Sequence, residues 1–143
     1  MAISISFSVT VFWRRSVRCC QAADAMQAVD ALIAAADEWN TDRATAGRPP
    51  ISIGMAVVTG RIIFGAVGDD TRLEYTVIGD PVNLCAKLEK HNRTAMSRAL
   101  TTCEAFDLAE RQGYQAPSTR ERIATATVEG VPTDLDLVVI ASR

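Results

Sequence analysis

Residues 73–89 of the chain read LEYTVIGDPVNLCAKLE. In residues 72–78 apolar and polar side chains alternate, which predicts a strand with one buried face. A helix is predicted to begin directly after this strand. Asp80 can accept hydrogen bonds from the free N–H groups of the first turn, and Pro81 suits the first helical position. The sequence therefore predicts a strand that leads into a helix running to about Asn92.

Two further strands are predicted upstream. Residues 51–58 are apolar and partly β-branched, and residues 61–67 resume this pattern after Thr59-Gly60. Because Thr-Gly is a turn signal between two strand-like runs, the sequence predicts a hairpin. A second turn at residues 68–71 leads to the strand at 72–78, so we expect a three-stranded antiparallel meander.

A long amphipathic helix is predicted from Cys19 to about Arg43, because apolar residues recur there at helical spacing. Its apolar stripe comprises Ala22, Met26, Val29, Ile33 and Ala36, with Leu32 and Trp39 beside it. Pro49 and Pro50 end the helical segment. Before the helix, residues 3–12 alternate apolar side chains with serine and threonine, which predicts a half-buried strand.

The C-terminal part continues this mixture of elements. A short strand is expected at 97–100, and Thr101 with Glu104 forms a capping box for a helix that Gly113 ends. Residues 121–128 and 135–140 are typical of a closing hairpin. The predicted class is α+β, with an antiparallel sheet and helices packed on one side.

Composition restricts the partners and the compartment. The chain has 143 residues, with 15 basic against 17 acidic ones, so one domain with no affinity for nucleic acid is expected. None of the four cysteines (Cys19, Cys20, Cys85, Cys103) has the spacing of a zinc ligand, which favours reduced thiols in the cytoplasm. No apolar run of about 18 residues is present, so we expect no membrane segment.

One helix face combines an amide with a cation. Asn83 and Lys87 are four residues apart and project from the same side near the helix N-terminus. The helix dipole favours anions there, so the pair could hold a ribose and the charge that develops on a phosphoryl group. From spacing alone, an ordinary solvated helix face is the alternative.

The quoted stretch resembles the signature of the class III nucleotidyl cyclase catalytic domain. Residues 51–60 and 65–68 are also similar to that family, and the resemblance is dense from residue 50 to 94. It implies a ferredoxin-like, cyclase-type sheet and the conversion of ATP to 3′,5′-cyclic AMP and pyrophosphate. It also implies a homodimer or a heterodimer with another cyclase domain, in which the active sites lie at the interface.

The resemblance assigns roles to three residues. Asn83 matches the asparagine that orients the ribose, and Lys87 falls where most members have an arginine that stabilises the transition state. Thr76 matches the position that reads the base, where threonine is similar to bacterial adenylate cyclases. ATP is therefore the implied nucleotide, although Thr76 taken alone is an ordinary strand residue.

Two departures from the family concern charged groups. The family holds Mg²⁺ or Mn²⁺ with two aspartates upstream of the long helix, whereas this chain has no Asp or Glu before Asp24. Val131 stands where relatives carry a Lys or Arg directed at the phosphates. We therefore expect the metal ligands to be absent from this chain. Residues 1–18 are interpreted as an atypical N-terminal strand, and residues 19–143 as the C-terminal two-thirds of a cyclase domain truncated at its N-terminus.

Three functions follow as hypotheses. The first is an adenylate cyclase domain that is inactive alone and supplies half of a shared site. The second is a non-catalytic cyclase-homology module that dimerises or binds a nucleotide. An unrelated α+β scaffold with a coincidental motif is the third.

Overall fold

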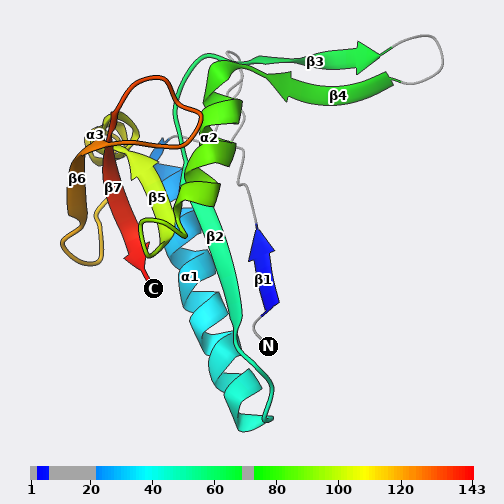
Figure 1. The fold of residues 1–143 in the computed structure, drawn as a ribbon, viewed down its shortest axis with the longest axis vertical. Helices are drawn as coiled ribbons and strands as arrows, with labels where there is room; N and C mark the ends of the chain where they lie inside the picture. Colours follow the sequence, from blue (N-terminus) through cyan, green and yellow to red (C-terminus); the bar gives the residue numbers. More distant parts are fainter. Residues whose placement is uncertain (1–2, 7–21, 69–72) are drawn as a thin grey trace.

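The computed structural model describes residues 3–6, 22–68 and 73–143. The strands are β1 (Ile3–Ser6), β2 (Ile51–Val57), β3 (Ile63–Gly68), β4 (Leu73–Ile78), β5 (Ser97–Thr102), β6 (Glu121–Ala126) and β7 (Leu135–Ser142). The helices are α1 (Ala22–Thr45), α2 (Asp80–His91) and α3 (Cys103–Arg111). Five strands form one sheet in the order β1-β2-β5-β7-β6, and β3 pairs with β4 in a separate hairpin (Figure 1).

The α+β class is confirmed, but the main sheet is mixed rather than antiparallel throughout. Strand β2 runs parallel to both β1 and β5, whereas β7 runs antiparallel to β5 and β6. The closing hairpin is confirmed as β6–β7. The strand predicted at residues 3–12 is confirmed over Ile3–Ser6, at the sheet edge beside β2, and residues 7–12 lie outside the described residues.

The predicted three-stranded meander is wrong. Strand β3 pairs with β4 from Ile63 opposite Ile78 to Gly68 opposite Leu73, but it does not pair with β2. Thr59-Gly60 does not form a hairpin turn, since β2 and β3 are not paired. Gly60 instead allows the backbone to approach Pro81 closely. A Cβ atom there would lie 2.4 Å from Cγ of Pro81. The β3–β4 hairpin therefore projects from the main sheet, as Figure 1 shows.

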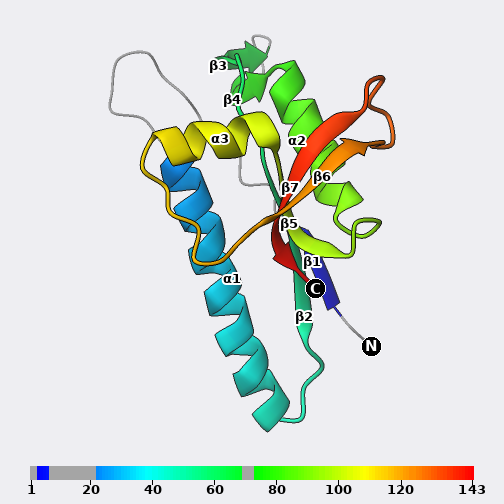
Figure 2. The same ribbon diagram turned by 90° about the vertical axis from the view of Figure 1, so that its left-hand side faces the viewer.

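Helices cover both faces of the sheet, which corrects the expectation of helices on one side (Figure 2). Met55 and Val57 pack in one cluster with residues of α1 and α3, whereas Ala56 packs in a second cluster with Cys85 and Leu88 of α2. Alternate residues of a strand point to opposite faces. Because the end of β2 is apolar at consecutive positions, both of its faces can be buried.

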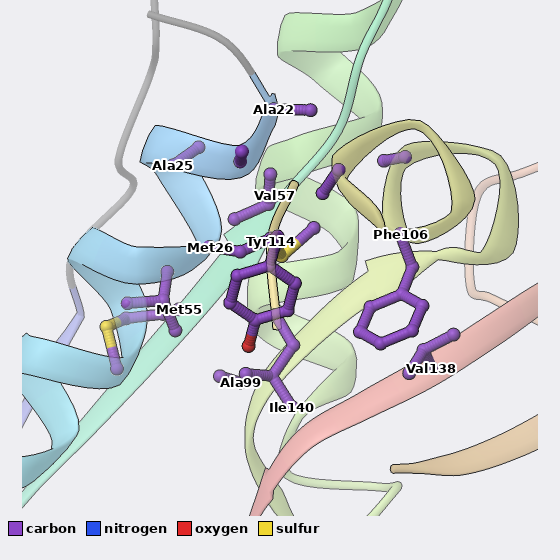
Figure 3. Packing of buried hydrophobic residues seen from close by; sticks show 14 residues of the cluster. Ala22, Ala25, Met26, Met55, Val57, Ala99, Phe106, Tyr114, Val138 and Ile140 are labelled. Carbon is purple, nitrogen blue, oxygen red and sulfur yellow. The ribbon is translucent and has the colours of Figure 1, made fainter. Parts of the chain in front are cut away.

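The larger cluster contains Ala22, Met26 and Val29 of the predicted α1 stripe (Figure 3). Ala36 is buried outside this cluster, whereas Leu32 and Trp39, which were expected beside the stripe, are exposed. Met26 and Val29 are fully buried, and Ile33 packs at the edge of the cluster. From α3 the Phe106 ring contributes, and it meets the ring of Tyr114 edge-on, with centroids 5.9 Å apart. Hence α1 and α3 share one hydrophobic core with the sheet.

A partly buried ion pair joins α1 to the segment that precedes β6. The Arg120 guanidinium lies 2.6 Å from Oδ1 of Asp30, and the Tyr114 hydroxyl donates to Oδ2 of Asp30 at 2.6 Å. Arg120 also donates to the carbonyl of Ile140 in β7. The Asp30 carboxylate thus connects α1 to Tyr114, which follows α3, and to Arg120, which precedes β6.

Helix α3 begins one residue later than the predicted capping box. Thr102 is the N-cap, and its side-chain oxygen accepts from the Ala105 N–H at 3.2 Å. The predicted cap, Thr101, is instead buried in the sheet, where its hydroxyl donates to the Val57 carbonyl at 2.8 Å. Gly113 follows the helix with φ +95°, which agrees with its predicted role as the end of the helix.

Candidate functional site

The N-terminus of α2 is built on backbone contacts. Gly79, not Asp80, is the N-cap, and its carbonyl accepts from the Val82 N–H at 3.1 Å. No side chain caps this helix and Asp80 is exposed, so the predicted Asp80 cap is wrong. A Cβ atom on Gly79 would lie 3.0 Å from the Arg61 carbonyl oxygen. Glycine therefore allows the connection between β2 and β3 to lie directly on the first turn of α2.

Asn83 and Lys87 both lie on α2, one turn apart, as predicted. Asn83 is exposed and Lys87 is half-buried. The Lys87 ammonium donates to the carbonyl of Gly130, in the turn between β6 and β7. Gly130 has φ +76°, and a Cβ atom there would approach Lys87 Cε to 3.4 Å. The candidate cation is thus held against a turn whose positive φ favours glycine.

Sequence reasoning did not identify Gly130 as part of this site. The two residues are 43 positions apart, so no helical or strand periodicity connects them. The signal that could have found it lies at the next residue, Val131, which stands where members of the family carry a Lys or Arg. That comparison drew attention to this turn, but it gave no reason to expect a contact with the Gly130 carbonyl.

Thr76 lies on β4, opposite Gly65 of β3, in the strand that leads into α2. The structure thus places the third predicted site residue on the hairpin, three positions before the Gly79 cap. It does not describe the Thr76 side chain, and the role of this residue stays a prediction.

The other end of α2 is fixed by a buried amide that the sequence analysis did not single out. Asn92 is 3% exposed, and its Nδ2 donates to the Met55 carbonyl at 2.8 Å. Its Oδ1 accepts from the Ser97 hydroxyl at 2.8 Å. Along the helix, a Cβ atom at Gly54 would lie 2.6 Å from a carboxylate oxygen of Glu89. These contacts lock α2 onto β2.

Cys85 lies under the site, on the buried side of α2. Its Sγ donates to the Ala56 carbonyl at 3.3 Å. Burial, reinforced by the nearby Glu89 carboxylate, raises the pKa of the Cys85 thiol to about 11. Cys85 therefore stays a protonated thiol at neutral pH and is a core residue rather than a nucleophile.

This raised pKa predicts a loss of stability at alkaline pH. The stabilisation from the protonated thiol is complete below its unfolded pKa near 9 and is lost as the pH rises towards 11. We expect a loss of roughly 2–3 kcal/mol from this group. Urea unfolding between pH 8 and 11 measures it. Cys85→Ala should remove this component, whereas Cys103→Ala should retain it. Equal alkaline profiles for the wild type and Cys85→Ala would contradict the prediction.

Within residues 3–6, 22–68 and 73–143, no group of three or more His, Cys, Asp or Glu side chains is arranged to hold a metal ion. On α1, Asp30 is paired with Arg120 and Asp37 with Arg98. This helix covers the sheet face opposite the one that α2 covers.

Among the described residues, no helix has both the length and the apolar character needed to cross a bilayer.

Comparisons with known proteins place this geometry in context. No protein-family model matches the chain. Two Mycobacterium tuberculosis proteins of uncharacterised function are similar: Rv1318c is 37% identical over 71 residues, and Rv1319c is 36% identical over 80 residues. These matches cover 50% and 56% of this chain but only 13% and 15% of the relatives.

Solved structures cover more of the chain. The adenylyl cyclase CyaB from P. aeruginosa superposes with a TM-score of 0.65 at 27% identity, over 92% of this chain and 66% of CyaB. The guanylyl cyclase Cya2 shares the fold, with a TM-score of 0.61 at 21% identity, over 89% of this chain and 62% of Cya2. The chain therefore has a cyclase-like fold, and the similarity supports a cyclase-homology domain.

Proposed function

We propose that this chain supplies the ribose and transition-state half of a shared adenylate cyclase site. In that site, ATP is converted to 3′,5′-cyclic AMP and pyrophosphate. The observation that carries the proposal is the display of Asn83 and Lys87 on one helix, within a fold similar to CyaB over 92% of the chain. Asn83 lies in the first turn of the helix, where anions are favoured, and Lys87 follows one turn later on the same side.

The reaction divides between these two residues. The ribose 3′ oxygen attacks the α-phosphorus, the bond from that phosphorus to the bridging oxygen of the β-phosphate breaks, and the 3′ hydroxyl loses its proton. The Asn83 amide can donate to and accept from the ribose and so orient the 3′ oxygen. Lys87 offsets the charge that develops on the phosphoryl oxygens.

The contact with Gly130 orients the Lys87 ammonium for this role. An ammonium group has three donors, and the Gly130 carbonyl uses one of them. The remaining two can face a phosphoryl group while the nitrogen stays fixed. A lysine offers a compact charge rather than the planar fork of an arginine, so weaker stabilisation than with arginine is expected.

A second cyclase domain is the proposed partner, because this sequence has no Asp or Glu before Asp24, where the family carries its metal ligands. That partner would contribute the carboxylates for Mg²⁺ or Mn²⁺. Ile63 and Ile78 pair across the base of the hairpin and are 72% and 52% exposed, which gives an apolar contact surface beside α2. In this proposal the pair is a homodimer or a heterodimer.

A non-catalytic cyclase-homology module is the second candidate. The lack of an Asp or Glu before Asp24, upstream of the long helix, favours it. Such a module would dimerise or bind a nucleotide without converting it.

An assay of cyclic AMP formation separates these candidates. The purified chain is incubated with ATP and Mg²⁺ or Mn²⁺, alone and mixed with an intact cyclase domain that lacks its own ribose-orienting Asn or transition-state Arg. We expect no product from the chain alone and product in the mixture. A parallel incubation with GTP tests the base preference assigned to Thr76. If neither the chain alone nor the mixture forms cyclic AMP, the non-catalytic module remains as the candidate. Formation of cyclic AMP by the chain alone would overturn the proposed division of the site.

A further inference from the structure

The turn between β6 and β7 lies beside α2 and carries the carbonyl that Lys87 contacts (Figure 1). It is closed by a hydrogen bond from the Val131 N–H to the Val128 carbonyl at 3.0 Å. Gly130 is the third of these four residues and has φ +76°, a backbone angle typical of that position in a type II turn. The Gly130 carbonyl therefore belongs to a hydrogen-bonded turn rather than to an open loop.

Both ends of this turn are apolar and pack with α2. Val128 is 2% exposed and belongs to the same hydrophobic cluster as Leu88 of α2. Val131 is half-buried and packs against that cluster. The two residues between them are exposed. The turn is therefore anchored at both ends in the core beneath α2, while its exposed middle reaches Lys87.

Lys87 needs a fixed contact if its ammonium is to occupy one position. A lysine side chain is a flexible four-carbon stem, so the helix alone does not determine where its charge lies. The hydrogen bond to Gly130 restricts this freedom, and Cε of Lys87 also lies 3.4 Å from the position of a Cβ atom on Gly130. A carbonyl can hold the ammonium in place only where the carbonyl is itself held. Anchoring of the turn at Val128 and Val131 meets that condition.

We propose that Val128 and Val131 are positioning residues for Lys87. Their side chains anchor the turn to the cluster beneath α2, the turn fixes the Gly130 carbonyl, and this carbonyl holds the ammonium of Lys87. The consequence for catalysis rests on the proposed function, in which Lys87 offsets charge on the phosphoryl group. Val131, at the position where the cyclase family carries a Lys or Arg, thus contributes through packing rather than through a charge of its own.

Exchange of the lysine ammonium protons with water, measured by NMR, tests this proposal independently of activity. Lys87 and Lys90 are the two lysines of the sequence, so the ¹⁵N-labelled full chain gives two lysine ammonium signals. We expect slower exchange at Lys87 than at the exposed Lys90, because Lys87 donates to Gly130. Val131→Ala should speed exchange at Lys87 about threefold or more, as partial loss of one hydrogen bond implies. Val128→Ala should act in the same direction, and Val131→Ile should keep the wild-type rate.

Ile123→Ala is the matched control for these variants. Ile123 lies on β6 and packs, half-buried like Val131, against the same cluster, but it is outside the turn. Its truncation should leave exchange at Lys87 unchanged, and a circular dichroism melt of each variant verifies that it is folded. Unchanged exchange at Lys87 in both Val131→Ala and Val128→Ala would overturn the proposal, as would an equal increase in Ile123→Ala.

Kinetics in the mixed cyclic AMP assay test the consequence for catalysis. Val131→Ala is expected to lower kcat about tenfold with little change in KM, because misplacement of the cation affects the transition state most. In a Lys87→Ala background the same substitution should cause no further loss, since it acts through Lys87. A further loss of similar size in that background would overturn the proposal. If the mixture forms no cyclic AMP, the proposed function fails, while the exchange rates of Lys87 still decide whether the turn positions it.

Discussion

Replacing Asp30 with alanine is expected to lower the free energy of unfolding by about 3 kcal/mol. The Asp30 carboxylate accepts from both Arg120 and Tyr114, and the Arg120 side chain is only 11% exposed. Removing the carboxylate leaves a guanidinium without its counter-ion in a position where water has little access. The Nε atoms of Arg120 and of Arg98, the partner of Asp37, are both buried without a hydrogen-bond partner, so the two ion pairs differ mainly in the exposure of the carboxylate.

Asp37→Ala is the matched control on the same helix. Asp37 is paired with Arg98, but its side chain is 56% exposed. An exposed pair of this kind contributes about 1 kcal/mol or less. Arg98 nevertheless lowers the pKa of Asp37, so the small contribution of this pair should disappear as the pH falls below 4. Urea unfolding at pH 7 compares the two variants, and equal losses would show that burial does not govern the Asp30 pair.

Lys87→Ala is expected to lower cyclic AMP formation in the mixed assay by about 100-fold or more, the range found for removal of a transition-state donor. The loss should fall mainly on kcat, because the proposed contact strengthens as charge develops on the phosphoryl group. Lys87→Arg should retain activity, since it keeps the cation and adds a planar fork.

Lys90→Ala is the control for this experiment. Lys90 is an exposed cation of the same helix, one position before its last residue, and it has no role in the proposed site. Its removal should leave kcat unchanged. If Lys87→Ala were as active as Lys90→Ala, the assignment of Lys87 would be wrong even if the chain proved to be part of a cyclase.

The sequence predicted the elements whose signals are local. The buried stripe of α1 follows from the 3.6-residue period, and the start of α2 follows from the proline and glycine around Asp80. The β6–β7 hairpin was predicted because its two strands are neighbours in the chain. The placement of Asn83 and Lys87 on one side of α2 was predicted for the same reason, because one helical turn connects them.

Contacts between distant segments could not be predicted in this way. The parallel pairing of β1 with β2 and the Lys87–Gly130 contact depend on how the whole chain closes. Gly60 was misinterpreted because a glycine in a turn and a glycine under Pro81 look the same in a sequence. The N-cap of α3 moved to Thr102 because the hydroxyl of Thr101 is used inside the sheet.

The two hydrophobic clusters on opposite sides of the sheet have a consequence for local unfolding. Cooperative units of a protein can open separately when each has its own packing. The cluster beneath α2 is the smaller one and includes Ala56, Cys85 and Leu88, while α1 and α3 share the larger cluster. We therefore expect helix α2 to open at a lower free-energy cost than global unfolding requires, which would expose the candidate site while the other layer remains native.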